Sequence, residues 1–371
     1  MEKKSLIGNG DSNISPAGSL TMKPLSSIIA IGNPIIDITA EIDEEIINRY
    51  HLKKGEITFM TQENANFFNE IESKTQVTFS TGGAVQNSLR IASWCLNKDP
   101  NNKNQNQKLT MLGSVGNDIN KDRIINSLKF YGVNPLLQVI PNMNTSRCAI
   151  GVYKNERCLV PDIKASNYLT ENFINENAQE ILSHEVLIIE GYFLKEKYDL
   201  CKKICEEFIK LNKYIILTLC DPFMIEFHEE KIMDIANYAD MIVGNVRTTE
   251  IMAKNTGNGV QEIFENIHKK LTKKNRLLLV TAGCQGAFCT SFNYETNKLE
   301  FLIQDFPQLI KMNDIVDDVG AREAFFGGFL SQQMQGKKIK SCCMCGNEIA
   351  NVILRNVGCT LPNDTTINFN Y

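Results

Sequence analysis

The feature of this sequence that most constrains its fold is a regular alternation of short apolar runs with longer amphipathic stretches. The apolar runs have the length of strands and lie at 28–32, 77–80, 109–115, 186–191, 214–220, 241–244 and 277–283. Stretches with helical periodicity lie at 62–71, 86–96, 121–131, 195–211, 231–236, 260–271 and 324–335. Such alternation is typical of βαβ units, in which helices cover both faces of a mainly parallel sheet. The pattern therefore predicts a doubly wound α/β fold.

Several segments break this rhythm. The stretches at about 35–57 and 145–160 are extended and have no crossover helix, so we expect them to form a small separate β sheet beside the main domain. The stretch 97–108 is polar and of low complexity, and it predicts a surface loop with no packing role. The polar segment 1–27 predicts a disordered tail ahead of a domain that spans 28–371.

Composition limits the classes of binding partner and the cellular compartment that we expect for this protein. The chain is 43% hydrophobic with a net charge of -4, which gives no indication of nucleic acid or an anionic membrane as a partner. We find no run of roughly 18 apolar residues, so we expect no transmembrane helix. Without the apolar stretch of a signal peptide in the first residues, we expect a cytoplasmic protein. Its twelve cysteines then predict reduced, buried thiols and no metal site.

Ligands of such folds bind beyond the carboxyl ends of the strands, so residues that directly follow strands are candidates for a site. The first strand ends in the letters GNPIID, which place Asn33 and Asp37 at this edge. A carboxylate there could accept hydrogen bonds from the hydroxyl groups of a ribose. The same letters also fit ordinary turn chemistry, and the motif alone does not separate the two interpretations.

A second candidate is the segment TGGAVQNS at 81–88, where two glycines follow a strand and open a helix. Glycine lets a ligand approach the backbone, and the N–H groups at a helix start face that ligand. Gly82 and Gly83 also fit a simple tight turn. Together with Asn87 in the first turn of the helix, they predict part of a binding site.

The segment DDVGAREAFFGG at 317–328 is the most specific. It resembles the signature of the ribokinase family, in which Asp-Thr-x-Gly-Ala-Gly-Asp opens a helix. The resemblance implies that the amides of Gly320, Ala321 and Arg322 form an anion hole, and that Glu323 stands where the family has its aspartate base. Backbone N–H groups at a helix start suit the transferring phosphoryl group, and a carboxylate can align the attacking hydroxyl.

Within that family the chain resembles adenosine kinases, over 28–362 and in the same motif order. The resemblance implies a ribokinase-like fold with a β lid, ATP as donor with Mg²⁺, adenosine as acceptor, AMP and ADP as products, and a place in purine salvage. It implies adenosine contacts for Asn33, Asp37, Gly82, Gly83, Asn87, Cys148 and Arg157. It implies nucleotide contacts for Asn245, Thr281 and Gly283.

The departures from the family pattern gather in the phosphoryl-transfer motif. Arg322 replaces a glycine and brings a long side chain to the phosphate position, with added strain if that position needs a positive φ. Glu323 replaces the aspartate base with a side chain one methylene longer, and a displacement of about 1 Å can cost roughly 10²-fold in rate. Thr248 replaces the glutamate of the metal-ordering Asn-x-x-Glu, and Asp318 adds negative charge.

Three interpretations follow. The first is a pseudokinase that binds adenosine or a related nucleoside, or serves as a structural part of a protein assembly through its N-terminal tail, with cytoskeletal association in that structural case. The second is an active adenosine kinase that uses Glu323 as base, with Arg322 holding phosphate. The third is a kinase for another nucleoside or sugar, against which Asn33 and Asp37 favour the adenosine branch.

Overall fold

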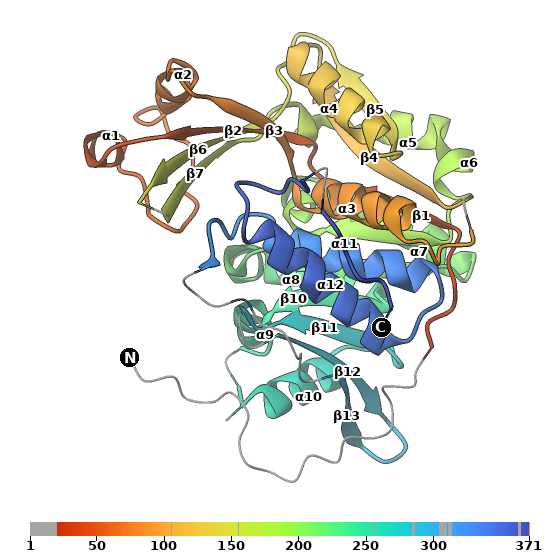
Figure 1. Ribbon diagram of the computed structural model, residues 1–371. Helices are drawn as coiled ribbons and strands as arrows, with labels where there is room; N and C mark the ends of the chain where they lie inside the picture. The colour runs from red at the N-terminus through yellow and green to blue at the C-terminus, as the bar shows by residue number, and fades with distance from the viewer. Residues whose placement is uncertain are drawn as a thin grey trace.

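The computed structural model describes residues 21–370, except 105, 155, 255, 258, 284–285, 304–309, 311–313 and 363–364. In this part of the chain a nine-stranded sheet forms the body of the molecule (Figure 1). Its strands, in spatial order, are β13 (Lys298–Ile303), β12 (Ala287–Asn293), β11 (Leu277–Thr281), β10 (Met241–Asn245), β9 (Tyr214–Thr218), β8 (Val186–Glu190), β1 (Ser27–Ile31), β4 (Lys108–Gly116) and β5 (Asn134–Ile140). The strands from β11 to β5 are parallel, and β12 and β13 are antiparallel additions.

Both faces of this sheet are buried, as the apolar strand pattern predicts. In β1, Ile28 and Ala30 point into one apolar core, and Ile29 and Ile31 point into the other. Successive side chains of a strand face opposite ways, so a strand covered on both faces is apolar throughout.

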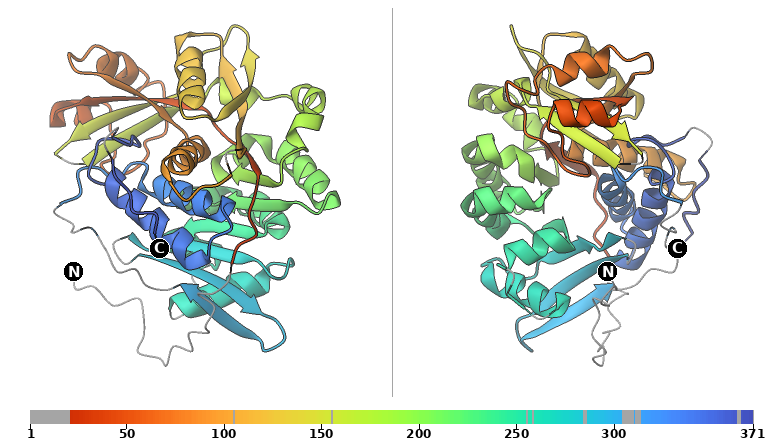
Figure 2. Two further views of the ribbon diagram at one scale, coloured as in Figure 1. Left: turned by 45° about the vertical axis from the view of Figure 1, so that its right-hand side comes forward. Right: turned by 90° about the vertical axis from the view of Figure 1, so that its left-hand side faces the viewer.

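Helices form a layer on each side of the sheet (Figure 2). One face carries α3 (Ala84–Lys98), α4 (Ile119–Phe130), α11 (Ala321–Met334) and α12 (Ile339–Ile353). The other carries α5 (Glu171–Glu176), α6 (Ala178–Ile181), α7 (Leu194–Lys210), α8 (Pro222–Tyr238), α9 (Val246–Met252) and α10 (Val260–Lys270). Two short 3₁₀ turns, η2 (Ala165–Tyr168) and η3 (Gly191–Phe193), precede α5 and α7 respectively. The predicted doubly wound α/β fold is confirmed.

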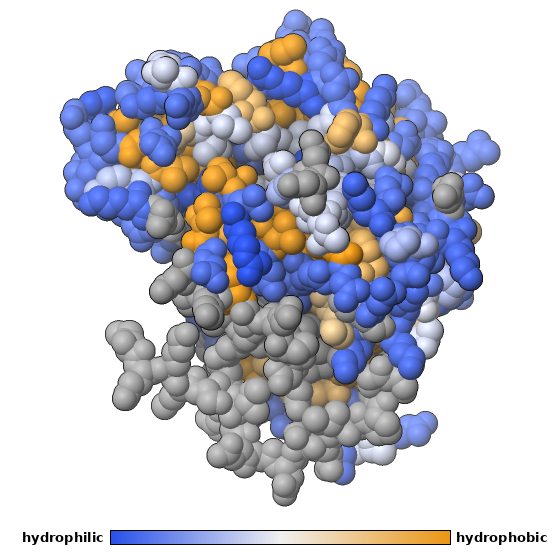
Figure 3. Space-filling model, viewed as in Figure 1, coloured by the Kyte–Doolittle hydropathy of each residue, from blue (hydrophilic) through white to orange (hydrophobic). Residues whose placement is uncertain are grey.

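A second, four-stranded sheet projects from one edge of the body and forms the lid. Its spatial order is β3 (Thr78–Gly82), β2 (Ile35–Glu41), β6 (Arg147–Tyr153) and β7 (Glu156–Asp162), with α1 (Glu44–Arg49) and α2 (Phe67–Glu72) packed against it. The apolar run 77–80 belongs to this lid and not to the strand–helix alternation of the main sheet, which corrects the sequence interpretation. Figure 3 shows apolar residues gathered between the lid and helices α11 and α12.

The described end of the N-terminal segment lies against the body of the protein. The N–H of Met22 donates to the carbonyl of Lys337, and the N–H of Leu25 donates to the carbonyl of Met334, both at 3.1 Å. The side chains of Met22 and Leu25 are buried. Residues 21–26 are therefore ordered against the link between α11 and α12, contrary to the predicted disorder, and residues 1–20 lie outside the described part.

The polar stretch 97–108 also has a packing role that its composition does not reveal. Asn97 and Lys98 complete α3, and Asp99 is buried at 4% exposure. The Asp99 carboxylate accepts hydrogen bonds from Gln332 at 3.0 Å and Gln335 at 2.8 Å. The loop after α3 is therefore bonded to the end of α11. Composition does not reveal this contact, because a polar residue can be buried when side-chain amides donate hydrogen bonds to it.

Eleven cysteines of the described residues are free thiols, ten of them buried, while Cys284 lies outside these residues. In the same residues, no group of three or more His, Cys, Asp or Glu side chains is arranged to hold a metal ion. None of the helices described here is both long and apolar enough to cross a membrane.

Candidate functional site

The candidate residues lie in a row along one edge of the large sheet. Thr281 and Asn245 end β11 and β10, Cys220 follows β9, Glu190 ends β8, and Asn33 follows β1. These strands are parallel neighbours in this spatial order, so their carboxyl ends share one edge. The residues predicted for the nucleotide and those predicted for the nucleoside therefore stand at opposite ends of one row, with the end of β9 between them.

Asn33, Asp37, Gly82 and Gly83 come together at the base of the lid. A Cβ on Gly82 would lie 2.3 Å from Asp37 Oδ1, and a Cβ on Gly83 would lie 2.4 Å from the carbonyl oxygen of Asn33. Gly83 also has a φ of 91°, which favours glycine. The two glycines thus let the chain's own Asp37 and Asn33 approach, a use that the sequence interpretation did not foresee.

The remaining predicted nucleoside residues surround this group. Asn87 is buried in α3, and its Oδ1 accepts a hydrogen bond from Arg90 Nη1 at 2.8 Å. Cys148 is the β6 neighbour of Asp37 in the lid sheet. Arg157 of β7 lies on the same face of the lid sheet as Cys148 and pairs with Asp317 of the body. Their roles toward a ligand stay predictions.

Two acids in this region have strongly shifted pKa values. Burial raises the pKa of Asp37 to about 7, partly opposed by the positive charges of Arg157 and Arg90. Burial also raises the pKa of Glu190 to about 7, partly opposed by the hydrogen bonds that it accepts. The charge of Glu323 raises both values further, so the three carboxyl groups share one electrostatic environment.

Glu190 is a site residue that the sequence reasoning missed. It is 1% exposed, and its carboxylate accepts hydrogen bonds from Asn33 N, Asn33 Nδ2 and Val85 N. The letters LIIEG contain the signal, because an acid at the end of a fully apolar strand is expected at a ligand-binding edge. Glu190 joins the ends of β1 and β8 to the start of α3.

The start of α11 brings together the residues of the signature motif. Gly320 precedes the helix with a φ of 82°, and a Cβ there would lie 2.4 Å from Cys359 Cβ. Ala321, Arg322 and Glu323 form the first turn, where no side chain caps the N–H groups. A helix start of this kind suits an anion.

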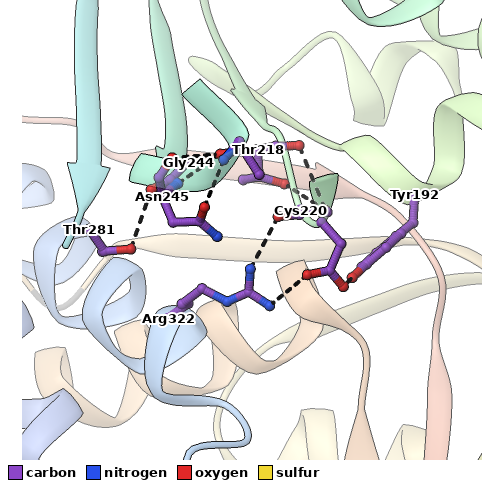
Figure 4. A network of polar contacts seen from close by, with 9 residues as sticks. Tyr192, Thr218, Cys220, Gly244, Asn245, Thr281 and Arg322 are labelled. Carbon is purple, nitrogen blue, oxygen red and sulfur yellow. Dashed lines mark hydrogen bonds and ion pairs between the residues drawn. The ribbon is translucent and has the colours of Figure 1, made fainter. Parts of the chain in front are cut away.

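The Arg322 side chain crosses the middle of the row (Figure 4). Nη1 donates to the carbonyl oxygen of Cys220 at 3.1 Å, and Nη2 donates to Asp221 Oδ1 at 3.2 Å. Asp221 also accepts a hydrogen bond from the hydroxyl of Tyr192. The neighbouring acids Glu323 and Asp221 hold the pKa of Arg322 above its usual range against the opposing effect of desolvation, although the side chain is 45% exposed.

The backbone strain expected at Arg322 lies elsewhere. Arg322 is inside the regular part of α11, and its φ is not positive. Cys220 instead has a φ of 59°, a left-handed conformation that costs a non-glycine residue roughly 1–2 kcal/mol. The strained residue is thus the one whose carbonyl oxygen receives the Arg322 guanidinium.

On the nucleotide side, Asn245 and Thr248 bind each other through two reciprocal hydrogen bonds. The Asn245 side chain accepts a hydrogen bond from Thr248 N at 2.8 Å, and the Thr248 hydroxyl accepts one from Asn245 N at 2.9 Å. This capping box starts α9 and leaves Thr248 fully buried. Glu250 forms a surface pair with Arg247. Thr281 faces Asn245 across β10 and β11, and Gly283 has a φ of 57°.

Three aromatic side chains connect the lid to this row. Phe59 of the lid lies 5.3 Å from Phe223 between ring centroids, and Phe223 stacks on Tyr192 at 5.8 Å. Phe59 is 55% exposed. Phe59 lies more than 100 positions from Tyr192 and Phe223 along the chain, so no local motif links it to the other two rings.

Comparisons with known proteins agree with this architecture. The model of the pfkB family of carbohydrate kinases matches residues 52–366. Adenosine kinase 2 of Arabidopsis thaliana is 25% identical over 92% of this chain and 97% of its own length. Adenosine kinase of Dictyostelium discoideum is 27% identical, covering 90% and 96%. In structure, adenosine kinase of Anopheles gambiae in complex with P1,P4-di(adenosine-5) tetraphosphate has a TM-score of 0.79 at 24% identity, covering 92% of this chain and 98% of its own. The match over most of its length shows that this chain belongs to the pfkB family of carbohydrate kinases.

Proposed function

We propose that this protein binds adenosine or a related nucleoside between the lid and the carboxyl edge of the large sheet, and that its phosphoryl transfer is lost or severely slowed. The relatives named above are adenosine kinases, which supports the nucleoside as ligand. The close grouping of Asn33 and Asp37 beside the glycine pair also supports a nucleoside ligand. The side chains of Asn33 and Asp37 offer oxygen acceptors to the hydroxyl groups of a ribose. The rings of Phe59, Tyr192 and Phe223 offer apolar faces to a base.

The observation that carries the second half of the proposal is the position of the Arg322 guanidinium. It is bonded to Cys220 and Asp221 at the end of β9, between the nucleotide end and the nucleoside end of the row. A phosphoryl group that moves from one end to the other must pass this ion pair. To admit it, Arg322 has to give up both hydrogen bonds and leave Asp221, whose charge then repels the phosphoryl oxygens.

The residues present do not fit a magnesium ion at the position that the family motif implies. The Asn245 side chain caps α9, and Thr248 is buried with its hydroxyl bonded to the backbone of Asn245. Neither residue offers a carboxylate, and hard cations such as Mg²⁺ bind chiefly through carboxylates and phosphates. We therefore assign no step to a metal held by this segment.

A second candidate function is an active kinase in which Glu323 is the base and Arg322 binds phosphate. One observation favours it: Arg322 sits in the first turn of α11 without strain, at a helix start that no side chain caps. In that case the guanidinium would exchange Asp221 for the phosphate, as its planar fork allows.

The two functions are separated by measuring adenosine binding by calorimetry together with ATP-dependent phosphorylation of adenosine in the presence of magnesium. We expect binding, with turnover far below about 1 per second. Turnover at or above that value would establish the active kinase instead. If adenosine neither binds nor is phosphorylated, the proposed function is wrong.

A further inference from the structure

The buried acid Glu190 controls one of the nucleoside-side residues. Its Oε1 accepts from Asn33 Nδ2 at 2.9 Å and from Asn33 N at 3.2 Å, and its Oε2 accepts from Val85 N at 3.2 Å. Asn33 itself is only 4% exposed, so its side chain has no freedom to find other partners. The amide nitrogen of Asn33 is thus committed to Glu190.

The other side-chain atom of Asn33 has no partner. Among the described residues, nothing donates a hydrogen bond to the buried Asn33 Oδ1. An unsatisfied buried acceptor costs about 1–3 kcal/mol, so such an atom at a ligand-binding edge indicates a missing donor. Because Glu190 binds the amide nitrogen and so fixes which way the amide group points, the free Oδ1 is turned toward other partners, and through it Asn33 acts toward a ligand as an acceptor.

Glu190 also supplies the negative charge at the start of α3. The N–H of Val85 points at its carboxylate, and a Cβ on Gly32 would lie 2.7 Å from its Oε2. A helix start ordinarily attracts anions. Here the protein's own carboxylate fills that place, and Glu323 lies near enough to influence it electrostatically.

We propose that Glu190 is a positioning and specificity residue: it orients Asn33 so that Oδ1 faces the nucleoside as an acceptor, and its carboxylate at the start of α3 makes the pocket select an uncharged, hydroxyl-bearing ligand over a phosphorylated one. This inference rests on the proposed nucleoside site and names the residue that sets its selectivity. It predicts that adenosine is preferred to AMP.

Two substitutions separate the two effects. In Glu190→Gln, the amide oxygen can still accept both Asn33 hydrogen bonds, but the negative charge is gone and the amide nitrogen faces the N–H of Val85. In Glu190→Leu, the charge and the hold on Asn33 are both lost. Glu185→Gln is the matched control, because Glu185 precedes the same strand at its opposite end and accepts a hydrogen bond from Ser26.

The experiment is calorimetry with adenosine and with AMP at about pH 8, where Glu190, whose pKa is about 7, is mostly ionised. For the unaltered protein we expect AMP to bind at least about tenfold more weakly than adenosine. In Glu190→Gln, the affinity for adenosine should change by less than about threefold. The ratio of the dissociation constant of AMP to that of adenosine should fall by about tenfold. Glu190→Leu should weaken adenosine about tenfold or more, and adding Asn33→Ala to it should cause no further loss. An unchanged adenosine-to-AMP ratio in Glu190→Gln, or additive losses in the double variant, would overturn the proposal.

A second readout keeps this test independent of adenosine binding. The Asn33 side-chain amide proton that is bonded to Glu190 should give a downfield-shifted NMR signal, which should remain in Glu190→Gln and move upfield in Glu190→Leu. If the unaltered protein binds no adenosine, the proposed function fails, yet this NMR pattern would still support the positioning of Asn33 by Glu190. Identical Asn33 signals in the unaltered protein and in Glu190→Leu would refute it, and failure of Glu190→Leu to fold leaves Glu190→Gln to decide.

Discussion

The guanidinium of Arg157 in the lid pairs with the carboxylate of Asp317 in the loop before α11, 160 positions further along the chain. Their side chains are only 8% and 1% exposed. Asp317 also accepts hydrogen bonds from Val319 N and Gly358 N. One buried ion pair thus joins the lid to the two loops that surround the start of α11.

Removing one member of this pair should destabilise the protein. Arg157→Ala leaves the Asp317 carboxylate buried without its cation, which typically costs about 3–5 kcal/mol. Urea denaturation of the unaltered and altered proteins measures the loss. Lys203→Ala, which breaks the exposed pair between Lys203 and Glu171, is the control and should change stability by less than about 1 kcal/mol. Equal, small effects of both substitutions would show that the lid is not held by this pair.

Arg322 offers a test of what limits phosphoryl transfer. Arg322→Ala removes the guanidinium from Cys220 and Asp221 and should raise the rate of AMP formation by about tenfold or more if the ion pair obstructs transfer. A coupled assay of ADP release measures the change. Arg49→Ala, at an exposed pair on the lid helix α1, should leave the rate unaltered. A lower rate in Arg322→Ala would instead favour Arg322 as a phosphate ligand.

Restoring the family's glutamate at position 248 should lower the stability of the folded protein. Thr248 is buried, and its hydroxyl completes the capping box that starts α9. Thr248→Glu breaks this box and pushes a carboxylate into the interior, so we expect a loss of about 2 kcal/mol or more in the free energy of unfolding. Thr248→Ser keeps the hydroxyl and should cost less than half as much. Chemical denaturation of both variants checks this, and a stable Thr248→Glu protein would contradict it.

Stability should fall as the pH rises through neutrality. The ordinary pKa values of Asp37 and Glu190 are 3.8 and 4.5, and burial raises both to about 7 in the folded protein. Between these values the folded state binds more protons than the unfolded state, so the free energy of unfolding decreases with increasing pH. Denaturation at about pH 5 and about pH 8 should show this decrease. Asp37→Asn should reduce the difference, and Asp122→Asn at the surface should not.

The sequence predicted the elements whose signals are local. The apolar strands β1, β4, β8, β9, β10 and β11 were found because both faces of the sheet are covered. Helix α12 was missed, because its sequence mixes cysteines with Gly346, which weakens the usual helical pattern. Gly346 is required by packing, since a Cβ there would lie 2.5 Å from the carbonyl oxygen of Phe325.

The site was predictable where a motif marks it and not where long-range contacts form it. Asn33, Asp37 and the start of α11 follow from short motifs. The partners of Arg322 do not, because Cys220 and Asp221 lie about 100 positions away and their geometry depends on a left-handed residue. For Glu190 the letters LIIEG mark a place at the sheet edge, but its bonds to Asn33 and Val85 span more than 100 positions and show no motif.

Helix α11 links the candidate site to the N-terminal segment. Its first turn carries Arg322 and Glu323, and its last residue, Met334, accepts the hydrogen bond of Leu25. Over 14 residues the helix is a stiff rod of roughly 20 Å. Residues 21–26 and the candidate site therefore lie at opposite ends of one continuous helix.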